Sequence, residues 1–556
     1  MKQFINSFPK SRFAVLAFTA TLGLSACDKE VTDLAPQNSI TEQSAFSDPA
    51  RIALAVTGVY NAAQSGYYDP LNGTGLAVRG YPFGAAASSL DDARGEDISD
   101  MAGFYGLVFA NTINPSSPNV VNMWSNLYSV INQANVTIDG LRKAAASGVI
   151  TAAVAADYEG EMRFLRALAH HELLIHFSRP YSDGKGSQVG VPYRDVPVNT
   201  IAGLELAKAQ GRGTVAEDYT KMLADLDYAE ANLLANRGSG TTAYYRVTRA
   251  TKGAAIALKQ RLRLHQGEWA EAVKEGDKLI GKTVTSGTTS FTYALAATPR
   301  AAFPGGANVT AENIFSIENS SDDNPGVNGA LANVFGSSAT IPNGGINGRA
   351  LLAISPILYN APFFTCADTR RTELMQQDKG LRVAAYVSKK YTDATNSTDF
   401  APIIRYAEVV LNQAEALARL GGANEVQALT YLNSIRNRAV ATADRYAPGS
   451  LTGNALIQAI LNERRIELVA EGFRWDDIHR LSGEKTFSTV PGGGIPAKID
   501  GNGGQLTKYD FYTCGSTTAA PAPAISAVPY SSPLFLWPIP ASELVTNPNI
   551  TPNPGY

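Results

Sequence analysis

The chain has little cysteine, with three residues among 556. The dense disulfide frameworks of small secreted domains and cysteine-rich zinc sites are therefore excluded. Cys366 and Cys514 either form one disulfide outside the cytoplasm or remain as two buried thiols, and the sequence leaves both possibilities open. Cys27 lies near the N-terminus and needs a different explanation, which its neighbours supply.

Long apolar runs are missing after residue 26. No later segment approaches the ~18 uninterrupted apolar residues that a membrane-spanning helix needs. An excess of positive charge is missing as well. The net charge is −3, and removing residues 1–26 takes away three positive charges and no negative ones, which shifts it to −6. This acidic balance argues against nucleic acid and anionic membrane surfaces as partners.

Motifs for nucleotide binding and hydrolysis are also absent. The chain has no P-loop, no Gly-rich dinucleotide fingerprint and no nucleophile elbow. All five histidines lie in predicted helices without the spacing of metal ligands, which favours structural roles. Asp500–Gly504 hints at a structural calcium loop, but it lacks the sixth-position glycine and the final glutamate of an EF-hand, so we expect a turn. No cofactor is expected.

The N-terminus has the pattern of an export signal. Lys2, Lys10 and Arg12 precede a mostly apolar stretch of 12 residues, 13–24, and we predict a signal peptide over residues 1–26. Leu24-Ser25-Ala26-Cys27 resembles the lipobox of bacterial lipoproteins, in which the cysteine receives a lipid; the alternative is a plain secreted protein with a chance cysteine. Acyl chains on Cys27 would hold the protein to a membrane through a tether formed by residues 27–50.

Most of the remaining chain shows the apolar spacing of paired helices. The predicted helices cover 49–60, 124–141, 158–177, 214–234, 248–266, 268–280, 403–420, 424–440, 456–471 and 474–481. Thr248 is the expected N-cap of the fifth. The segment lengths approach those of tetratricopeptide repeats. We therefore predict a mainly α fold, in which tetratricopeptide-like helix pairs form a scaffold, with a large, irregular, loop-rich insertion that contains short strands.

Loops rich in Gly, Pro, Asn and Ser interrupt this scaffold and define the expected organisation. An N-terminal helical region covers 51–282 and contains a loop with short strands, not helix, at 65–120. An irregular insertion covers 283–400, and a C-terminal helical region with a loop at 484–535 covers 401–556. So much irregular chain in a compact protein is usually functional, so we expect the ligand site there.

Five stretches carry a resemblance to a known family. They are Glu161–Ala167, Arg405–Ala416, Tyr431–Ala439, Asn462–Asp477 and the C-terminal pair Leu536–Pro540 with Asn553–Tyr556. In this order they resemble the signatures of the SusD/RagB family, although Thr551-Pro552 stands where a glutamine often precedes the final Asn-Pro-Gly. The resemblance implies a non-catalytic surface lipoprotein of Bacteroidetes. It further implies binding of an oligosaccharide, or in some members a peptide, and delivery to a TonB-dependent SusC-like transporter in the outer membrane.

The charges of these stretches are better explained by structure than by catalysis. Between Glu463 and Glu471, acidic and basic residues alternate with apolar ones. We predict a partly buried ion-pair network that fixes two helices, with Arg464 facing Glu467 or Leu468 one turn on and Glu467 facing Glu471.

The ligand site is expected in the loops. The first candidate set precedes the predicted helix at 124, where glycan-binding relatives place a ligand loop, and consists of Asp91, Asp92, Asp97, Asp100, Phe104 and Tyr105. Asp97 and Asp100 stand near where some relatives have tryptophan or asparagine, and the competing interpretation is that Asp91 and Asp92 cap turns. The second candidate set comes from the insertion and consists of Asn324, Phe335, Asn343 and Tyr359, whose two aromatic residues are equally consistent with a core.

Two further classes of function stay open at this point. A secreted glycoside hydrolase on a helical scaffold would need two carboxylates ~5–9.5 Å apart across a cleft, and Asp92 with Asp97 is the pair to test. A helical-repeat scaffold that binds only protein is the other alternative.

Overall fold

The computed structural model describes residues 42–65, 68–69, 74–75, 82–339, 348–380 and 384–556. Two predicted site residues, Cys27 and Asn343, lie outside the described residues. Among the described helices, none combines the length and the apolar content that crossing a membrane requires.

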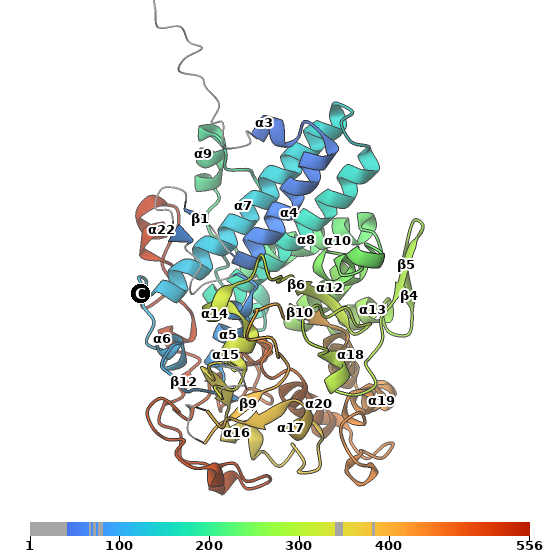
Figure 1. Cartoon of the computed structure of the whole chain (residues 1–556). Coiled ribbons are helices and arrows are strands. Elements are labelled where there is room, and N and C mark those ends of the chain that lie inside the picture. Colours follow the sequence, from blue (N-terminus) through green and yellow to red (C-terminus); the bar gives the residue numbers. More distant parts are fainter. Residues whose placement is uncertain (1–41, 66–67, 70–73, 76–81, 340–347, 381–383) are drawn as a thin grey trace, which may run out of the picture.

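The N-terminal half is a layered stack of helices (Figure 1). Its helices are α3 (Glu42–Ala45), α4 (Pro49–Ser65), α5 (Ala85–Arg94), α6 (Gly106–Phe109), α7 (Pro118–Ala146), α8 (Ala152–Phe177), α9 (Ile201–Ala209), α10 (Val215–Asn232), α11 (Tyr245–Thr248), α12 (Lys252–Gln266) and α13 (Trp269–Asp277). The helix α7 packs on α8, α8 on α10 and α10 on α12, while α4 lies against α7. Successive helices therefore bury their apolar stripes against one another.

The C-terminal half continues the stack. Its helices are α18 (Tyr406–Leu420), α19 (Asn424–Arg436), α20 (Gly453–Glu467), α21 (Phe473–Leu481) and α22 (Ala541–Thr546). The helix α18 packs against α19 and α20, and α12 and α13 connect it to the N-terminal half. The predicted paired-helix fold is thus confirmed, with one large apolar core running through both halves.

Between the two halves, the chain forms short helices and strands. The helices are α14 (Gly326–Gly329), α15 (Leu331–Phe335), α16 (Pro356–Tyr359) and α17 (Arg370–Glu373). The strands of the described residues are β1 (Tyr68–Asp69), β2 (Thr74–Gly75), β3 (Ile98–Asp100), β4 (Thr283–Ser286), β5 (Thr289–Thr292), β6 (Asn313–Ile317), β7 (Leu352–Ile354), β8 (Met375–Gln377), β9 (Tyr386–Ser388), β10 (Ala401–Arg405), β11 (Gly494–Ile495) and β12 (Val528–Pro529).

The largest sheet joins the two regions in which the ligand site was expected. It has the order β3-β7-β9-β8, with antiparallel pairs throughout. The strand β3 follows the first candidate carboxylates, and β7 belongs to the insertion. The strands β6 and β10 form a second antiparallel pair, and β4 and β5 form a hairpin.

One prediction about secondary structure is wrong. Residues 85–94 form the ten-residue helix α5, although the segment 65–120 was expected to contain no helix. The Gly and Pro content of the whole segment obscured the window Ala85–Arg94, which contains neither residue and is bounded by Gly84 and Gly95. Alanine has the highest helix propensity, and such a window favours helix locally.

Several element boundaries also differ from the predictions. Thr251, whose hydroxyl accepts a hydrogen bond from the amide of Ala254, is the N-cap of α12, and Thr248 instead ends α11. The helix α20 ends at Glu467 and not at residue 471, because Ala470 adopts a left-handed backbone conformation (φ 65°). The expected tether also contains α3.

Cys366 and Cys514 form a disulfide. The bond joins the central insertion to the loop at 484–535 and closes a ring across a sequence separation of 148 residues. Of the two possibilities that the sequence left open, the structure therefore has the bridge.

Candidate functional site

The four predicted ligand carboxylates are buried. Asp91 and Asp92 lie on α5, and Asp97 and Asp100 lie beside and within β3. Their exposed fractions are 6%, 1%, 2% and 1%, respectively. Direct contact of these side chains with a large ligand is therefore disfavoured, and each has an internal environment that explains its burial.

Asp97 and Asp100 have structural partners. Asp97 accepts hydrogen bonds from Nε and from the terminal nitrogen of Arg465, a bidentate pair between distant parts of the chain. One carboxylate oxygen of Asp100 accepts hydrogen bonds from the amides of Ala102 (3.0 Å) and Gly103 (2.9 Å) and so closes the turn after β3. The turn-capping role that was considered for Asp91 and Asp92 thus belongs to Asp100.

The pair proposed for glycoside hydrolysis has no room for a substrate. Asp92 and Asp97 line a space of only about 10 Å³ together with Arg464 and Arg465. Burial raises the pKa of Asp92 to about 7, against the opposing effects of the Gly472 amide and Lys390. A space that holds at most about one water molecule does not admit a glycosidic bond.

The other predicted residues divide between core and surface. Tyr105 and Phe335 are core side chains, and Phe104 is partly buried and packs edge-on against Tyr105 with ring centroids 5.0 Å apart. Asn324 is exposed, and its side chain accepts a hydrogen bond from the amide of Gly326 at 2.9 Å. Tyr359 is partly buried and stacks at a tilt on Tyr386. Their ligand-binding roles stay predictions.

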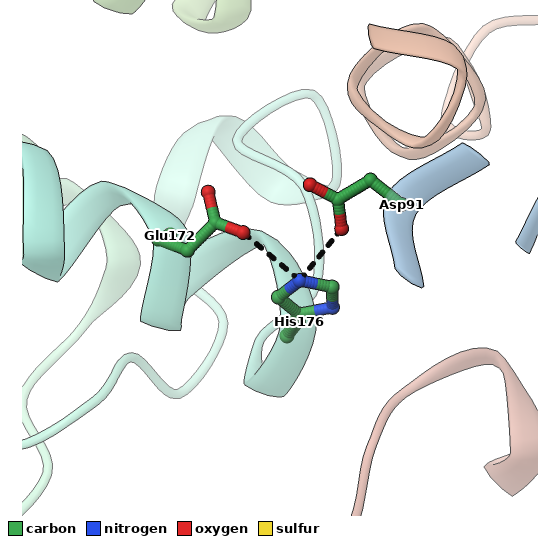
Figure 2. Close-up of side chains that lie close together, drawn as sticks. All are labelled: Asp91, Glu172 and His176. Atoms are coloured by element: carbon green, nitrogen blue, oxygen red, sulfur yellow. Dashed lines mark hydrogen bonds and ion pairs between the residues drawn. The ribbon is translucent and has the colours of Figure 1, made fainter. Parts of the chain in front are cut away.

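A compact polar cluster lies between α5 and α8 (Figure 2). His176 Nε2 lies 2.9 Å from Asp91 Oδ1 and 3.2 Å from Glu172 Oε1. Burial lowers the pKa of His176, and burial together with the nearby carboxylates of Glu172 and Asp476 raises the pKa of Asp91 well above its usual range. Both shifts favour the neutral forms, of the imidazole and of the Asp91 carboxyl, respectively.

These three side chains have the composition of a metal site, but their hydrogen bonds disfavour one. Arg94 NH1 lies 2.9 Å from His176 Nδ1, and a guanidinium can only donate. The Nδ1 atom must then accept, which assigns the ring proton to Nε2, the atom that faces both carboxylates. A metal ion needs a lone pair at that nitrogen. The cluster is better explained as a buried hydrogen-bond network.

The predicted ion-pair network near residue 467 is present, with different partners. Glu467 contacts Arg370, Arg405 and Arg438. Arg464 pairs with Asp477 of α21 and not with Glu467. The arginine and carboxylate side chains of this network are all nearly inaccessible, so it fixes helices and does not form a surface site.

An open cavity of about 250 Å³ lies at the surface beside α4. We call it the α4 pocket. Its lining residues are Thr57, Tyr60, Asn61, Gln64, Tyr244, Tyr245, Thr248, Arg249, Ile317, Glu318, Ser320 and Asp323. Positions 57, 60, 61 and 64 follow the i, i+3, i+4, i+7 spacing, which places them on one face of α4. The segment 244–249 and the end of β6 supply the other walls.

Two adjacent tyrosines form the aromatic wall of this pocket. The rings of Tyr244 and Tyr245 are 4.7 Å apart and nearly perpendicular, and both side chains are partly exposed. Arg249 lies next to them and is fixed by a bidentate pair with Glu161, with distances of 2.6 and 2.8 Å. Tyr60 donates to the same carboxylate and accepts from the amide of Ala250. Glu161 therefore fixes both Arg249 and Tyr60 beside the two tyrosines.

A second, more open cavity of about 680 Å³ adjoins the first. We call it the hairpin pocket because the β4–β5 hairpin forms one side. Its lining residues are Tyr158, Leu234, Asn236, Arg237, Gly238, Ser239, Tyr245, Arg249, Thr288, Thr289 and Ser290. Tyr245 and Arg249 line both cavities, so the two pockets meet at these side chains.

The combined surface offers aromatic rings, amides, hydroxyls and charged groups. Aromatic faces pack on the C–H faces of sugar rings, while the polar groups can hydrogen-bond hydroxyls. Sequence reasoning did not select these residues. The signal that would have found them is the doublet Tyr244-Tyr245 directly after the Gly-, Ser- and Thr-rich segment 238–243.

Comparison with known families gives two matches in separate parts of the chain. A sequence model of the SusD family matches residues 364–556. A model described as starch-binding and associating with the outer membrane matches residues 90–264. These segments include most of the stretches that carried the resemblance.

Individual relatives give the same result. SusD-like protein P25 of Formosa agariphila is 22% identical over 92% of this chain and 93% of its own length. SusD-like protein P2 of the same organism is 33% identical, but the match spans only 29% of this chain and 26% of that protein.

Solved structures show the same fold. A SusD superfamily protein from Bacteroides fragilis has a TM-score of 0.69 at 23% identity and covers 91% of this chain and 99% of its own. A laminarin-binding SusD-like protein has a TM-score of 0.62 at 18% identity, with coverages of 92% and 100%.

Proposed function

The chain belongs to the SusD/RagB family, and from this premise we propose that it is a cell-surface lipoprotein that binds oligosaccharides and delivers them to a TonB-dependent, SusC-like outer-membrane transporter. We place the oligosaccharide in the α4 pocket and the hairpin pocket. Two comparisons support this class of ligand. One matching family model is described as starch-binding and associating with the outer membrane, and one structural neighbour is a laminarin-binding SusD-like protein.

The observation that carries the proposal is the pair of pockets that share Tyr245. The cavities of about 250 and 680 Å³ together reach the size of ligand sites for molecules larger than a single sugar. Their shared wall presents aromatic rings to both sides. A linear oligosaccharide fits such a surface because each sugar has a C–H face for an aromatic ring and hydroxyls for the polar rim.

Calorimetry on the purified lipidated protein in detergent tests the site. Maltohexaose and laminarihexaose serve as probes. We expect one of them to release binding heat, and we expect Tyr244→Ala and Tyr245→Ala each to weaken that binding about tenfold or more, because each removes a stacking surface. Tyr431→Ala is the matched control, since Tyr431 is a partly buried tyrosine of α19 that lines neither pocket.

Four outcomes would contradict the proposal. One is the absence of heat with both hexaoses; another is a loss of binding in the control that equals the loss in the pocket variants. Binding of peptides in place of sugars would favour the peptide-binding branch of the family. Release of new reducing ends would indicate a glycoside hydrolase, for which the buried Asp92 and Asp97 provide no cleft.

Anchoring and delivery rest on the lipobox-like segment and on the family. Labelling of cells with a palmitate analogue should mark the wild-type protein and not the Cys27→Ala variant, because that thiol is the proposed attachment point. The transporter should be recovered with the wild-type protein when the outer membrane is solubilised. A protein that carries no label and is released into the medium would contradict this part of the proposal.

A further inference from the structure

The arginines that line the two pockets form ion pairs inside the protein, whereas the carboxylates of the α4 pocket do not. Arg249 is neutralised by Glu161, and Arg237 is neutralised by Asp157 through contacts of 2.9 and 2.6 Å. A further nitrogen of Arg237 donates to the carbonyl of Ala250 at 2.7 Å. Both cations of the pocket walls are therefore occupied by internal partners.

The carboxylates of the α4 pocket have no such partners. Neither Glu318 nor Asp323 forms an ion pair with any residue of the described chain. Glu318 is partly buried at the end of β6, and burial is the main reason that its pKa is raised. Asp323 is exposed at the rim. Glu318 forms a hydrogen bond with Thr248, and the charge of Arg249 partly offsets the effect of burial on its pKa. The pocket consequently carries negative charge that no ion pair neutralises.

A third acceptor lies in the same wall. Gln64 is 4% exposed, and its amide nitrogen donates to Asn319 Oδ1 (3.0 Å) and to the carbonyl of Asp323 (3.1 Å). Its Oε1 atom has no hydrogen-bond partner among the described residues. A buried acceptor without a donor is costly, and it is satisfied when a ligand or water supplies one.

The aromatic residues complete the pattern. Tyr60, Tyr244 and Tyr245 line the same cavity as the two free carboxylates. Tyrosine faces attract cations through their π electrons. The α4 pocket therefore combines two carboxylates that form no ion pair and one buried amide oxygen that has no donor with three aromatic rings, and these groups fit a ligand that donates hydrogen bonds and carries positive charge.

We propose that the α4 pocket selects a sugar that carries a free primary amine, so that the preferred ligands are oligosaccharides with unacetylated 2-amino sugars. This inference rests on the proposed oligosaccharide-binding function. In its protonated form, which predominates in mildly acidic solution, the amine offers three donors, enough to reach Glu318, Asp323 and the region of Gln64. The rest of the chain would continue past Tyr245 into the hairpin pocket, whose arginines are neutralised and do not repel it.

Calorimetry with two matched tetramers tests the inference on the purified lipidated protein in detergent. The probes are the β-1,4 tetramer of glucosamine and its fully N-acetylated counterpart, which differ in charge. We expect the free-amine tetramer to bind about tenfold more tightly or better. The preference should decrease as the ionic strength rises, because salt screens the attraction.

Isosteric variants assign the preference to the pocket. Glu318→Gln and Asp323→Asn should each reduce the ratio of the two affinities, that of the free-amine tetramer to that of the acetylated tetramer, several-fold. Asp322→Asn is the matched control, because Asp322 is the exposed neighbour of Asp323 and does not line the pocket. The exposed position of Asp323 keeps the test valid even if the change at Glu318 disturbs folding.

The outcomes separate this inference from the proposed function. Equal affinity for both tetramers, or a preference that survives both pocket variants, overturns the inference while oligosaccharide binding stands. Tighter binding of a trilysine peptide than of the glucosamine tetramer overturns the assignment to a sugar. If neither the tetramers nor the neutral hexaoses bind, the proposed function fails, and the inference fails with it.

Discussion

Asp477 accepts hydrogen bonds from two arginines that come from different helices. Arg464 of α20 contacts both carboxylate oxygens at 3.1 and 3.0 Å, and Arg480 of α21 contacts one of them at 2.9 Å. Arg480 also binds Glu415 of α18 through two bonds. Asp477 thus connects α20 to α21, and through Arg480 it is linked to α18. Its removal leaves buried guanidinium charge without compensation.

We expect Asp477→Asn to lower the free energy of unfolding by about 3–5 kcal/mol, because breaking one side of a buried pair exposes the full cost of desolvating the other. Urea unfolding at pH 7 measures this change. The control is Asp510→Asn, which alters an exposed aspartate without an ion pair in the described structure and should have almost no effect.

The pH dependence gives a second measurement on the same pair of proteins. The two arginines lower the pKa of Asp477 from 3.8 to about 2. A carboxyl group with a lowered pKa in the folded state contributes stability above its unfolded pKa and loses that contribution as the pH falls toward the folded value. The wild-type protein should therefore lose stability between pH 4 and 2 more steeply than the variant. Parallel pH profiles would show that Asp477 does not contribute through its charge.

Individual partners of the buried charges were difficult to predict from the sequence. The density of charge near residue 467 indicated a network, and the network is present. However, helix spacing placed only Glu467 or Leu468 beside Arg464, and it could not identify a partner beyond the end of the helix. Because α20 ends at Glu467, the chain turns and brings Asp477 to Arg464. Ion pairs between residues on either side of a turn depend on the geometry of that turn, and the periodic spacing of residues in the sequence gives no information about it.

At the scale of single elements, the junction between α20 and α21 depends on one glycine. Gly472 precedes α21 with a φ of 93°, a conformation that other residues rarely adopt. A side-chain carbon at this position would lie 2.9 Å from the Cα atom of Ser88 on α5. The glycine therefore permits both the turn and the close approach of α5.

A comparison of Gly472 with Gly422 separates the effect of the backbone conformation from the effect of the close contact with α5. Gly422 also has a positive φ, 63°, but a side-chain carbon there would meet nothing within 4 Å. We expect Gly422→Ala to cost about 1 kcal/mol from backbone strain alone. Gly472→Ala should cost about 1–3 kcal/mol more, because the contact with α5 adds overpacking. Chemical unfolding of both variants measures the difference. Equal losses would mean that the α5 contact relaxes without cost.

The long helices were accessible to sequence reasoning, and α5 was not. Helices such as α7 and α8 bury a continuous apolar stripe over many turns, which produces a clear period. The helix α5 is short, and its polar residues Asp91, Asp92 and Arg94 are buried. Tertiary packing against α21 adds to the helix propensity of its alanine-rich window, and this packing is not visible in a local pattern.

At the scale of the whole molecule, the disulfide connects two loop regions that lie far apart in the chain. In the loop-entropy description, a ring of this size stabilises the folded state by about 5 kcal/mol, and measured values are commonly about 2–5 kcal/mol. We expect Cys366→Ser with Cys514→Ser to lower the melting temperature, and a phosphine reductant to lower it for the wild-type protein. The double variant is the control for the reductant, because it has no bond left to reduce. An unchanged melting temperature in both experiments would contradict this prediction.

The candidate site shows why function was harder to predict than fold. The fold follows from periodic patterns and from the family resemblance, which extends along the chain. The α4 pocket takes residues from α4, from the segment 244–249 and from the end of β6, three segments separated by long stretches of sequence. Only Asn324 of the predicted ligand residues is a direct chain neighbour of a lining residue, Asp323. Such proximity arises from folding and leaves no local pattern.

The helix that forms one wall of the α4 pocket is also the first long helix of the chain. After α3, the chain enters the helical stack at Pro49, so any mechanical load on the N-terminal segment acts first on α4. Tyr60 and Gln64 fasten α4 to Glu161 of α8 and to Asn319 after β6, and tension would spread along these two links. A pull at the proposed lipid anchor and a ligand in the proposed site would therefore act on the same helix, and force applied to one would be transmitted to the other.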